Sequence, residues 1–177
     1  KSVFWGLIGV LALMMIEPAI HTVRNLSYNY VYFNPLAGGL KGTFGEYEQD
    51  YWGLSTKKAV GWLEEQGVFQ EASPEDPVVV TTNFSYPVRR YLANYEKQGV
   101  AKIVYTRFRQ RYDKEWDYGI YIGRFVDPGQ LKSGYWPSDK AVHAVEANGV
   151  PLCIVIKADE ENLAFNGQQA LQAGNYQ

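Results

Sequence analysis

The sequence predicts an α/β (α+β) protein. We expect an N-terminal transmembrane helix, then a mixed sheet of about five strands with flanking helices and a C-terminal β-hairpin. Three observations predict this: an uncharged apolar run at the amino end, a strand–helix–strand pattern in the middle, and an Asn-Gly pair between two late apolar runs. With 177 residues, 46% of them hydrophobic, the chain suits one compact domain with a packed core.

The apolar run is the first element. Residues 3–16 carry no charge, and a helix extended from there to Ile20 would span about 27 Å, close to the hydrocarbon core of about 30 Å. Glu17 would then lie near the far interface, where a carboxylate costs little. Aromatic residues that suit an interfacial belt follow at Tyr28, Tyr30, Tyr32 and Phe33.

Three other interpretations of this run stay open. It can be a buried core helix, a secretory signal, or a segment whose true start precedes Lys1. We favour the last transmembrane helix of a membrane protein, complete or clipped. With Lys1 on the cytoplasmic side, the body would lie outside the cytoplasm, which predicts a single span in the cell membrane and a periplasmic body.

The sequence divides into four segments. We expect a transmembrane helix over residues 1–26 and an aromatic, glycine-rich connection over 27–54. An extracytoplasmic α/β domain would follow over 55–158, and a C-terminal helix over 159–177. In the connection, residues 38–45 superficially suggest a phosphate loop, but they lack its residue order and are best interpreted as a flexible link.

The elements of the α/β domain follow from periodicity and turn residues. A helix over 55–66 begins at Ser55 as its N-cap, and a second begins at Ser85 and ends before Gly99. Short links on either side of the second helix imply a right-handed parallel crossover between its flanking strands. The predicted strands are Val78–Thr82, 101–108, 117–126, 142–147 and Val150–Lys157.

The last two strands form the predicted hairpin. Asn148-Gly149 between them is the strongest two-residue hairpin signal. Pro151 near the start of the last strand predicts a sheet edge there. The tail over 160–177 should form one more helix that ends near Gly174.

Composition excludes several classes of function. Lys and Arg total 17 against 19 Asp and Glu, a net charge of −2, which argues against a nucleic-acid-binding protein. One cysteine and two histidines argue against a disulfide scaffold and a metal centre. His143 and Cys153 are interpreted as structural, and no serine has the setting of a nucleophile. We therefore predict no catalytic residue, metal or cofactor.

Asp50, Tyr51 and Trp52 form the first candidate binding site. A carboxylate beside two aromatic rings suits a sugar, since rings stack on apolar sugar faces and carboxylates accept hydroxyl hydrogen bonds. Glu46 and Glu48 lie nearby and could pair with Asp50. The alternative is the start of a helix that packs its aromatic residues, and this is the interpretation we favour.

Arg107, Arg109 and Arg111 form the second candidate site. At strand spacing their side chains point the same way and could hold phosphates or anionic lipid headgroups. The alternative, which we favour, is a solvated strand face with Asp113 and Glu115 nearby to neutralise it.

Residues 30–63 read YVYFNPLAGGLKGTFGEYEQDYWGLSTKKAVGWL. This segment resembles the region after the last transmembrane helix of bacterial GT-C-type membrane glycosyltransferases, relatives of the dolichyl-phosphate-mannose protein mannosyltransferases. The family pattern is Y-x-Y-F-N-P-L-x-G-G, then D-Y-W-G-x-S, then an amphipathic helix. It is matched by Tyr30, Tyr32, Phe33, Asn34, Pro35, Leu36, Gly38, Gly39, Asp50, Tyr51, Trp52, Gly53 and Ser55.

Further matches preserve the order over most of the chain. They are Asp117-Tyr118, Trp136-Pro137, Gly149-Val150-Pro151 and Val155. The resemblance implies the extracytoplasmic C-terminal domain of an enzyme that uses polyprenyl-phosphate sugars. It does not transfer catalysis, because the family's catalytic acids lie in early external loops.

Two hypotheses follow. The chain is a non-catalytic part of such a glycosyltransferase that helps to bind acceptor or lipid-linked donor. Alternatively, it is a structural accessory subunit of a respiratory or photosynthetic membrane complex. The expected partners are membrane lipids, upstream transmembrane helices or other membrane subunits, and a polyprenyl-phosphate sugar. The tail from Leu163 resembles the first helix of a tetratricopeptide repeat, with Gly174 and Tyr176 near its turn positions.

Overall fold

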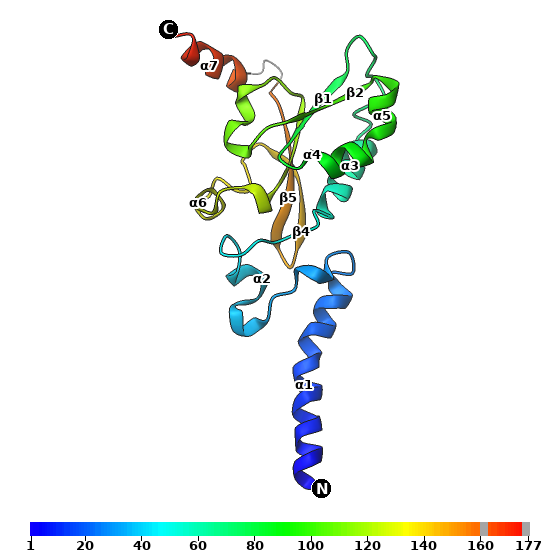
Figure 1. The fold of residues 1–177 in the computed structure, drawn as a ribbon, viewed down its shortest axis with the longest axis vertical. Helices are drawn as coiled ribbons and strands as arrows, with labels where there is room; N and C mark the ends of the chain where they lie inside the picture. Colours follow the sequence, from blue (N-terminus) through cyan, green and yellow to red (C-terminus); the bar gives the residue numbers. More distant parts are fainter. Residues whose placement is uncertain (160–162, 175–177) are drawn as a thin grey trace.

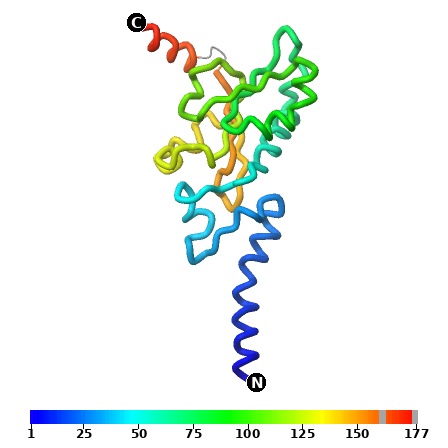
Figure 2. Tube along the Cα trace, in the orientation of Figure 1, coloured from blue at the N-terminus to red at the C-terminus, as the bar shows by residue number. Residues whose placement is uncertain are grey.

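A computed structural model describes residues 1–159 and 163–174 (Figure 1). Helix α1 extends from one end of an α/β body, and the Cα trace leaves its amino end far from every other segment (Figure 2). The helices are α1 (Ser2–Arg24), α2 (Gly39–Gly42), α3 (Ser55–Glu65), α4 (Ser85–Tyr91), α5 (Ala93–Gln98), α6 (Pro128–Lys132) and α7 (Leu163–Gln172). The 3₁₀ turns are η1 (Asn29–Val31), η2 (Pro35–Ala37), η3 (Phe108–Asp113) and η4 (Gly123–Phe125).

One mixed sheet organises the body. Its strands are β1 (Val78–Thr82), β2 (Ala101–Tyr105), β3 (Tyr118–Ile122), β4 (Ala141–Ala147) and β5 (Val150–Lys157). They lie in the order β2-β1-β3-β5-β4, with β1 parallel to β2 and β3, and β5 antiparallel to β3 and β4. The predicted α/β class, five-stranded mixed sheet, parallel crossover and C-terminal hairpin are confirmed.

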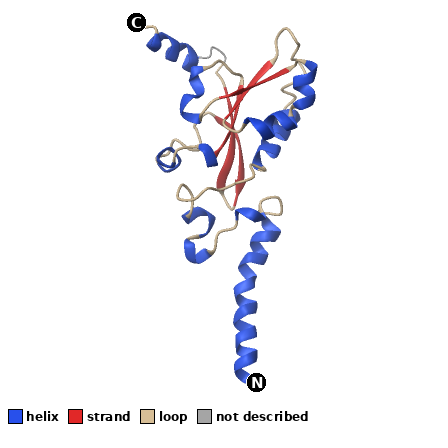
Figure 3. Ribbon diagram, viewed as in Figure 1, coloured by secondary structure: helices blue, strands red, loops and turns tan. Residues whose placement is uncertain are grey.

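Helices cover the two faces of the sheet unequally. Helix α3 packs on β3, β4 and β5, and α4 and α5 pack on β2, whereas α6 lies on the other side (Figure 3). In a second buried cluster, the Phe108 ring of η3 meets the rings of Tyr121 and Trp136 edge to face, and the Tyr121 hydroxyl group lies 2.6 Å from the hydroxyl group of Thr106. Burial raises the pKa of Tyr121 to about 12.

The hairpin forms as predicted, but its last strand is not at the edge of the sheet. Asn148 and Gly149 have φ angles of 49° and 71°, which a type I′ turn requires. Strand β5 lies inside the sheet, so the predicted edge at Pro151 is wrong. Strand β3 pairs with β5 only from Cys153 onward, and the pairing with β4 is irregular next to Pro151, with Leu152 of β5 as the extra residue, so the missing N–H group is tolerated.

Several local predictions were wrong. Phe84, not Ser85, is the N-cap of α4, and the strand predicted over 117–126 ends at Ile122 because η4 follows. The predicted second helix divides into α4 and α5 at Leu92, and strand β2 ends at Tyr105 because η3 follows. The glycine-rich link is ordered, since α2 buries Leu40 and the Gln49 side chain donates a hydrogen bond to the Leu40 carbonyl at 2.9 Å. The tail forms α7 as predicted, while Tyr176 lies outside the described residues.

Helix α1 has the length and apolar composition of a membrane span. Its apolar side chains are exposed, and its last turn is fixed to the body. There the Asn148 carboxamide accepts a hydrogen bond from Asn25 at 2.8 Å and lies 3.1 Å from Nδ1 of His21. One turn nearer the amino end of α1, Glu17 accepts a hydrogen bond from Tyr32 at 2.5 Å. The helix therefore ends on the β4–β5 turn.

Candidate functional site

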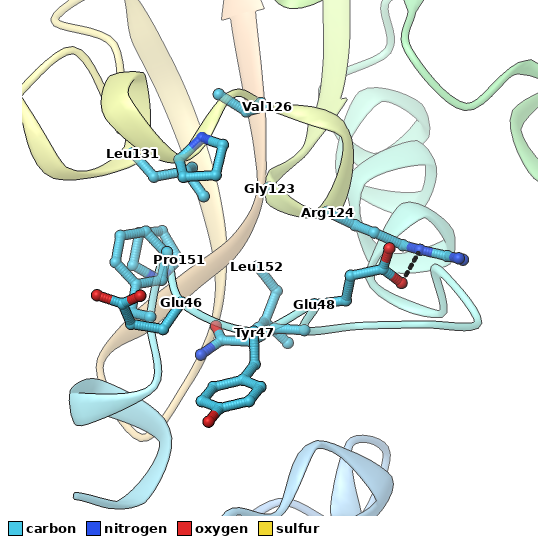
Figure 4. Close-up of a pocket in the computed structure, with 13 residues that line it drawn as sticks. Glu46, Tyr47, Glu48, Gly123, Arg124, Val126, Leu131, Pro151 and Leu152 are labelled. Atoms are coloured by element: carbon cyan, nitrogen blue, oxygen red, sulfur yellow. Dashed lines mark hydrogen bonds and ion pairs between the residues drawn. The ribbon is translucent and has the colours of Figure 1, made fainter.

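A cavity of about 220 Å³ opens where the connection meets the sheet (Figure 4). Residues 44–49 form one wall, η4 and α6 form the opposite wall, and Pro151 and Leu152 at the start of β5 form the base. The connection, residues 27–54, lies between α1 and the sheet, which places this cavity toward the α1 end of the body (Figure 1).

Two ion pairs join the walls of the cavity. Arg124 Nε lies 3.0 Å from the Glu48 carboxylate, as Figure 4 shows, and Lys132 pairs with Glu46. The Arg124 guanidinium also lies 4.0 Å from the ring centroid of Tyr51 and donates a hydrogen bond to its carbonyl. Glu46 and Glu48 thus each pair with a cation. The sequence suggested that they could pair with Asp50, and neither does.

Asp50 lies inside the protein, away from this cavity. Its side chain is buried and accepts hydrogen bonds from the hydroxyl groups of Tyr30 and Ser55. Ser55 therefore does not act as the N-cap of α3, and Leu54 occupies that position. Burial raises the pKa of Asp50, and the two hydroxyl donors oppose that rise. Asp50 therefore stabilises the start of α3 and is not available to bind a ligand.

The raised pKa of Asp50 predicts a pH-dependent stability. The folded state then binds a proton more tightly than the unfolded state, whose aspartate pKa is about 4. This stabilisation is present below that value and is lost as pH rises through the folded-state pKa. In thermal unfolding of the full chain in detergent, the wild type should therefore lose stability relative to Asp50→Asn as pH increases above about 4. A constant difference between the two proteins would contradict this assignment.

Tyr51 and Trp52 separate from Asp50 and face solvent. Their exposed fractions are 53% and 66%, and their rings meet edge to face at 5.1 Å. Tyr47, also exposed, lines the cavity nearby. The predicted trio is thus divided: its two rings remain available for stacking on a ligand, and its carboxylate does not. The alternative that we favoured, a helix start that packs these aromatic residues, holds only for Asp50, because both rings are exposed.

The prediction that Arg107, Arg109 and Arg111 point the same way from a strand is wrong. Arg107 precedes the 3₁₀ turn η3 and the other two lie within it, so residues two apart do not share a face as they would on a strand. Arg111 turns inward, with its guanidinium 4.3 Å from the ring centroid of Phe108. Arg107 and Arg109 stay exposed and line a second cavity of about 490 Å³.

His143 and Cys153 both occupy structural settings. The His143 ring stacks on Trp62 with centroids 5.1 Å apart, and burial lowers its pKa. Cys153 is fully buried, which raises the pKa of its thiol. Within residues 1–159 and 163–174, no group of three or more His, Cys, Asp or Glu side chains is placed to hold a metal ion.

Sequence reasoning missed the two cations of the first cavity. Arg124 and Lys132 reach Glu48 and Glu46 across 76 and 86 residues of chain, and no local pattern marks such pairs. No family model, curated protein or solved structure matches the chain.

Proposed function

We propose that this chain is a membrane-anchored extracytoplasmic domain of a polyprenyl-phosphate-sugar-dependent glycosyltransferase. It carries no catalytic group of its own and supports the binding of acceptor or lipid-linked donor. One observation carries the proposal: the segment that bears the family motifs folds between α1 and the sheet and presents exposed Tyr47, Tyr51 and Trp52 there. A sugar held on such rings would lie on the membrane side of the body.

A single span is part of this proposal. With α1 in the bilayer and Lys1 on the cytoplasmic side, the body lies in the periplasm. Glu17 and its hydrogen-bond partner Tyr32 would then lie at the interface, where aromatic residues and carboxylates are tolerated.

A second candidate is a structural accessory subunit of a larger membrane complex. Helix α7 favours it, because Leu163 and Leu171 are 59% and 58% exposed. Native sizing after gentle detergent extraction tests association, and both functions predict a particle much larger than the chain plus its micelle. A stable, partner-free monomer would contradict both.

Ligand binding separates the two candidates. The full chain in lipid nanodiscs should bind a polyprenyl-phosphate mannose without transferring the sugar. Replacing both Tyr51 and Trp52 with alanine should weaken binding about 30-fold, since aromatic contacts contribute about 1 kcal/mol each. Tyr86→Ala, which removes an 80% exposed ring on α4, is the control and should have no effect. Absence of binding would favour the structural subunit, and sugar transfer by the purified chain would contradict a non-catalytic domain.

A further inference from the structure

The parallel half of the sheet has a topological switch point. From β1 the chain crosses to β2 on one side, and it later returns to place β3 on the other side of β1. The carboxyl ends of all three strands therefore point to the same edge of the sheet. In open α/β sheets, ligands bind in the crevice outside this edge, where the strand order reverses.

The second cavity lies at this edge. Of the residues that line its volume of about 490 Å³, Arg107, Phe108 and Arg109 directly follow β2. Phe125 and Asp127 follow β3 and lead into α6, which adds Gln130. The turn η4 separates this cavity from the first one, because Arg124 lines the first and Phe125 lines the second.

The side chains that line the cavity carry a net positive charge, from two arginines and one aspartate. Arg107 and Arg109 are exposed, and neither guanidinium group forms an ion pair or hydrogen bond with the described residues. The other wall holds one carboxylate, Asp127, which accepts a hydrogen bond from the backbone N–H of Gly129 at 2.8 Å. By contrast, Arg111 and Arg124 are held by neighbouring rings and carbonyls.

We infer that this cavity binds the phosphate group of a small hydroxylated molecule. Guanidinium groups form paired, charge-assisted hydrogen bonds with phosphate oxygens, so Arg107 and Arg109 would hold the phosphate. The Phe125 ring, 44% exposed, would contact the apolar face of the attached group. Asp127 and Gln130 offer oxygen atoms that accept hydrogen bonds from hydroxyl groups.

This inference goes beyond the proposed function. It rests on strand topology and on a cavity distinct from the aromatic surface around Tyr51, so it stands even if the glycosyltransferase assignment fails. The phosphate can belong to a water-soluble ester or to a lipid headgroup, and the two sources require separate probes.

Titration of the full chain in phosphatidylcholine nanodiscs tests the site. The probes are glucose 1-phosphate, free glucose and soluble dihexanoyl phosphatidic acid. Calorimetry measures their binding. We expect binding of a phosphorylated probe and none of free glucose. The double substitution Arg107→Gln and Arg109→Gln should weaken that binding at least about tenfold, the order expected from losing charged hydrogen bonds. Tighter binding of glucose 1-phosphate indicates a soluble ester, and tighter binding of the phosphatidic acid indicates a headgroup.

A charge-matched variant is the control. Arg90→Gln with Lys97→Gln removes the same two positive charges from exposed positions on α4 and α5, away from the cavity. It should bind as the wild type does. Equal weakening in both double variants would show general charge attraction and overturn the inference. Failure of the wild type to bind either phosphorylated probe would overturn it as well.

Discussion

Two lysines in the middle of α1, at Val10 and Leu11, should release the chain from membranes. The wild type should stay in the membrane pellet through high-salt and carbonate washes, and the variant should appear in the soluble fraction. A lysine at the centre of a membrane helix costs about 2.5 to 3.5 kcal/mol. Val10 and Leu11 are 55% and 61% exposed, so no protein core replaces the lipid around them.

A variant with the two lysines at the end of α1, instead of its middle, is the control. The same double substitution at Thr22 and Val23, in the last turn of α1, should leave the chain in the pellet because lysine side chains there reach the interface. Release of the wild type by carbonate would identify α1 as a peripheral or soluble helix instead.

Gly53→Ala should destabilise the body by about 2 to 4 kcal/mol. Gly53 has a φ angle of +63°, which side chains disfavour, and a Cβ atom there would lie 2.4 Å from Cε1 of Phe84. The Phe84 ring meets Phe125 edge to face at 5.2 Å, so the clash also reaches η4. Chemical unfolding of the full chain in detergent measures the loss.

Gly61→Ala is the matched substitution. Gly61 lies within α3, and a Cβ atom there would meet nothing within 4 Å. Alanine in a helix interior should therefore stabilise the protein by about 0.5 to 1 kcal/mol. If the two variants unfold alike, then the close approach of Gly53 to Phe84 does not determine the stability of this segment.

The sequence predicted the elements whose signals are local. The β-branched run at β1 and the apolar run at β5 have the predicted bounds, and Asn148-Gly149 forms the predicted turn. The end of β2 was not predicted because contacts of η3 determine it, among them its packing against the distant helix α7. There Trp116 donates a hydrogen bond to the Arg111 carbonyl, which favours the compact turn η3 over a continued strand.

The candidate sites were predicted only in part. Tyr51 and Trp52 are exposed, as a binding surface requires, but a buried Asp50 could not be distinguished from an exposed one by its neighbours in sequence. Arg107 and Arg109 were selected for their charge, and the cavity that they share with Phe125 depends on the strand order. Spacing along a chain does not specify which loops meet at a sheet edge.

The contact between Asn148, His21 and Asn25 has a mechanical consequence. A domain tethered by a flexible linker rotates freely above its membrane, whereas here the hydrogen bonds of Asn148 join α1 to the sheet as a rigid stalk. Any change in the tilt of α1 in the bilayer would swing the sheet through the same angle. With α1 in a bilayer, the height of both cavities above the lipid would therefore follow the tilt of α1.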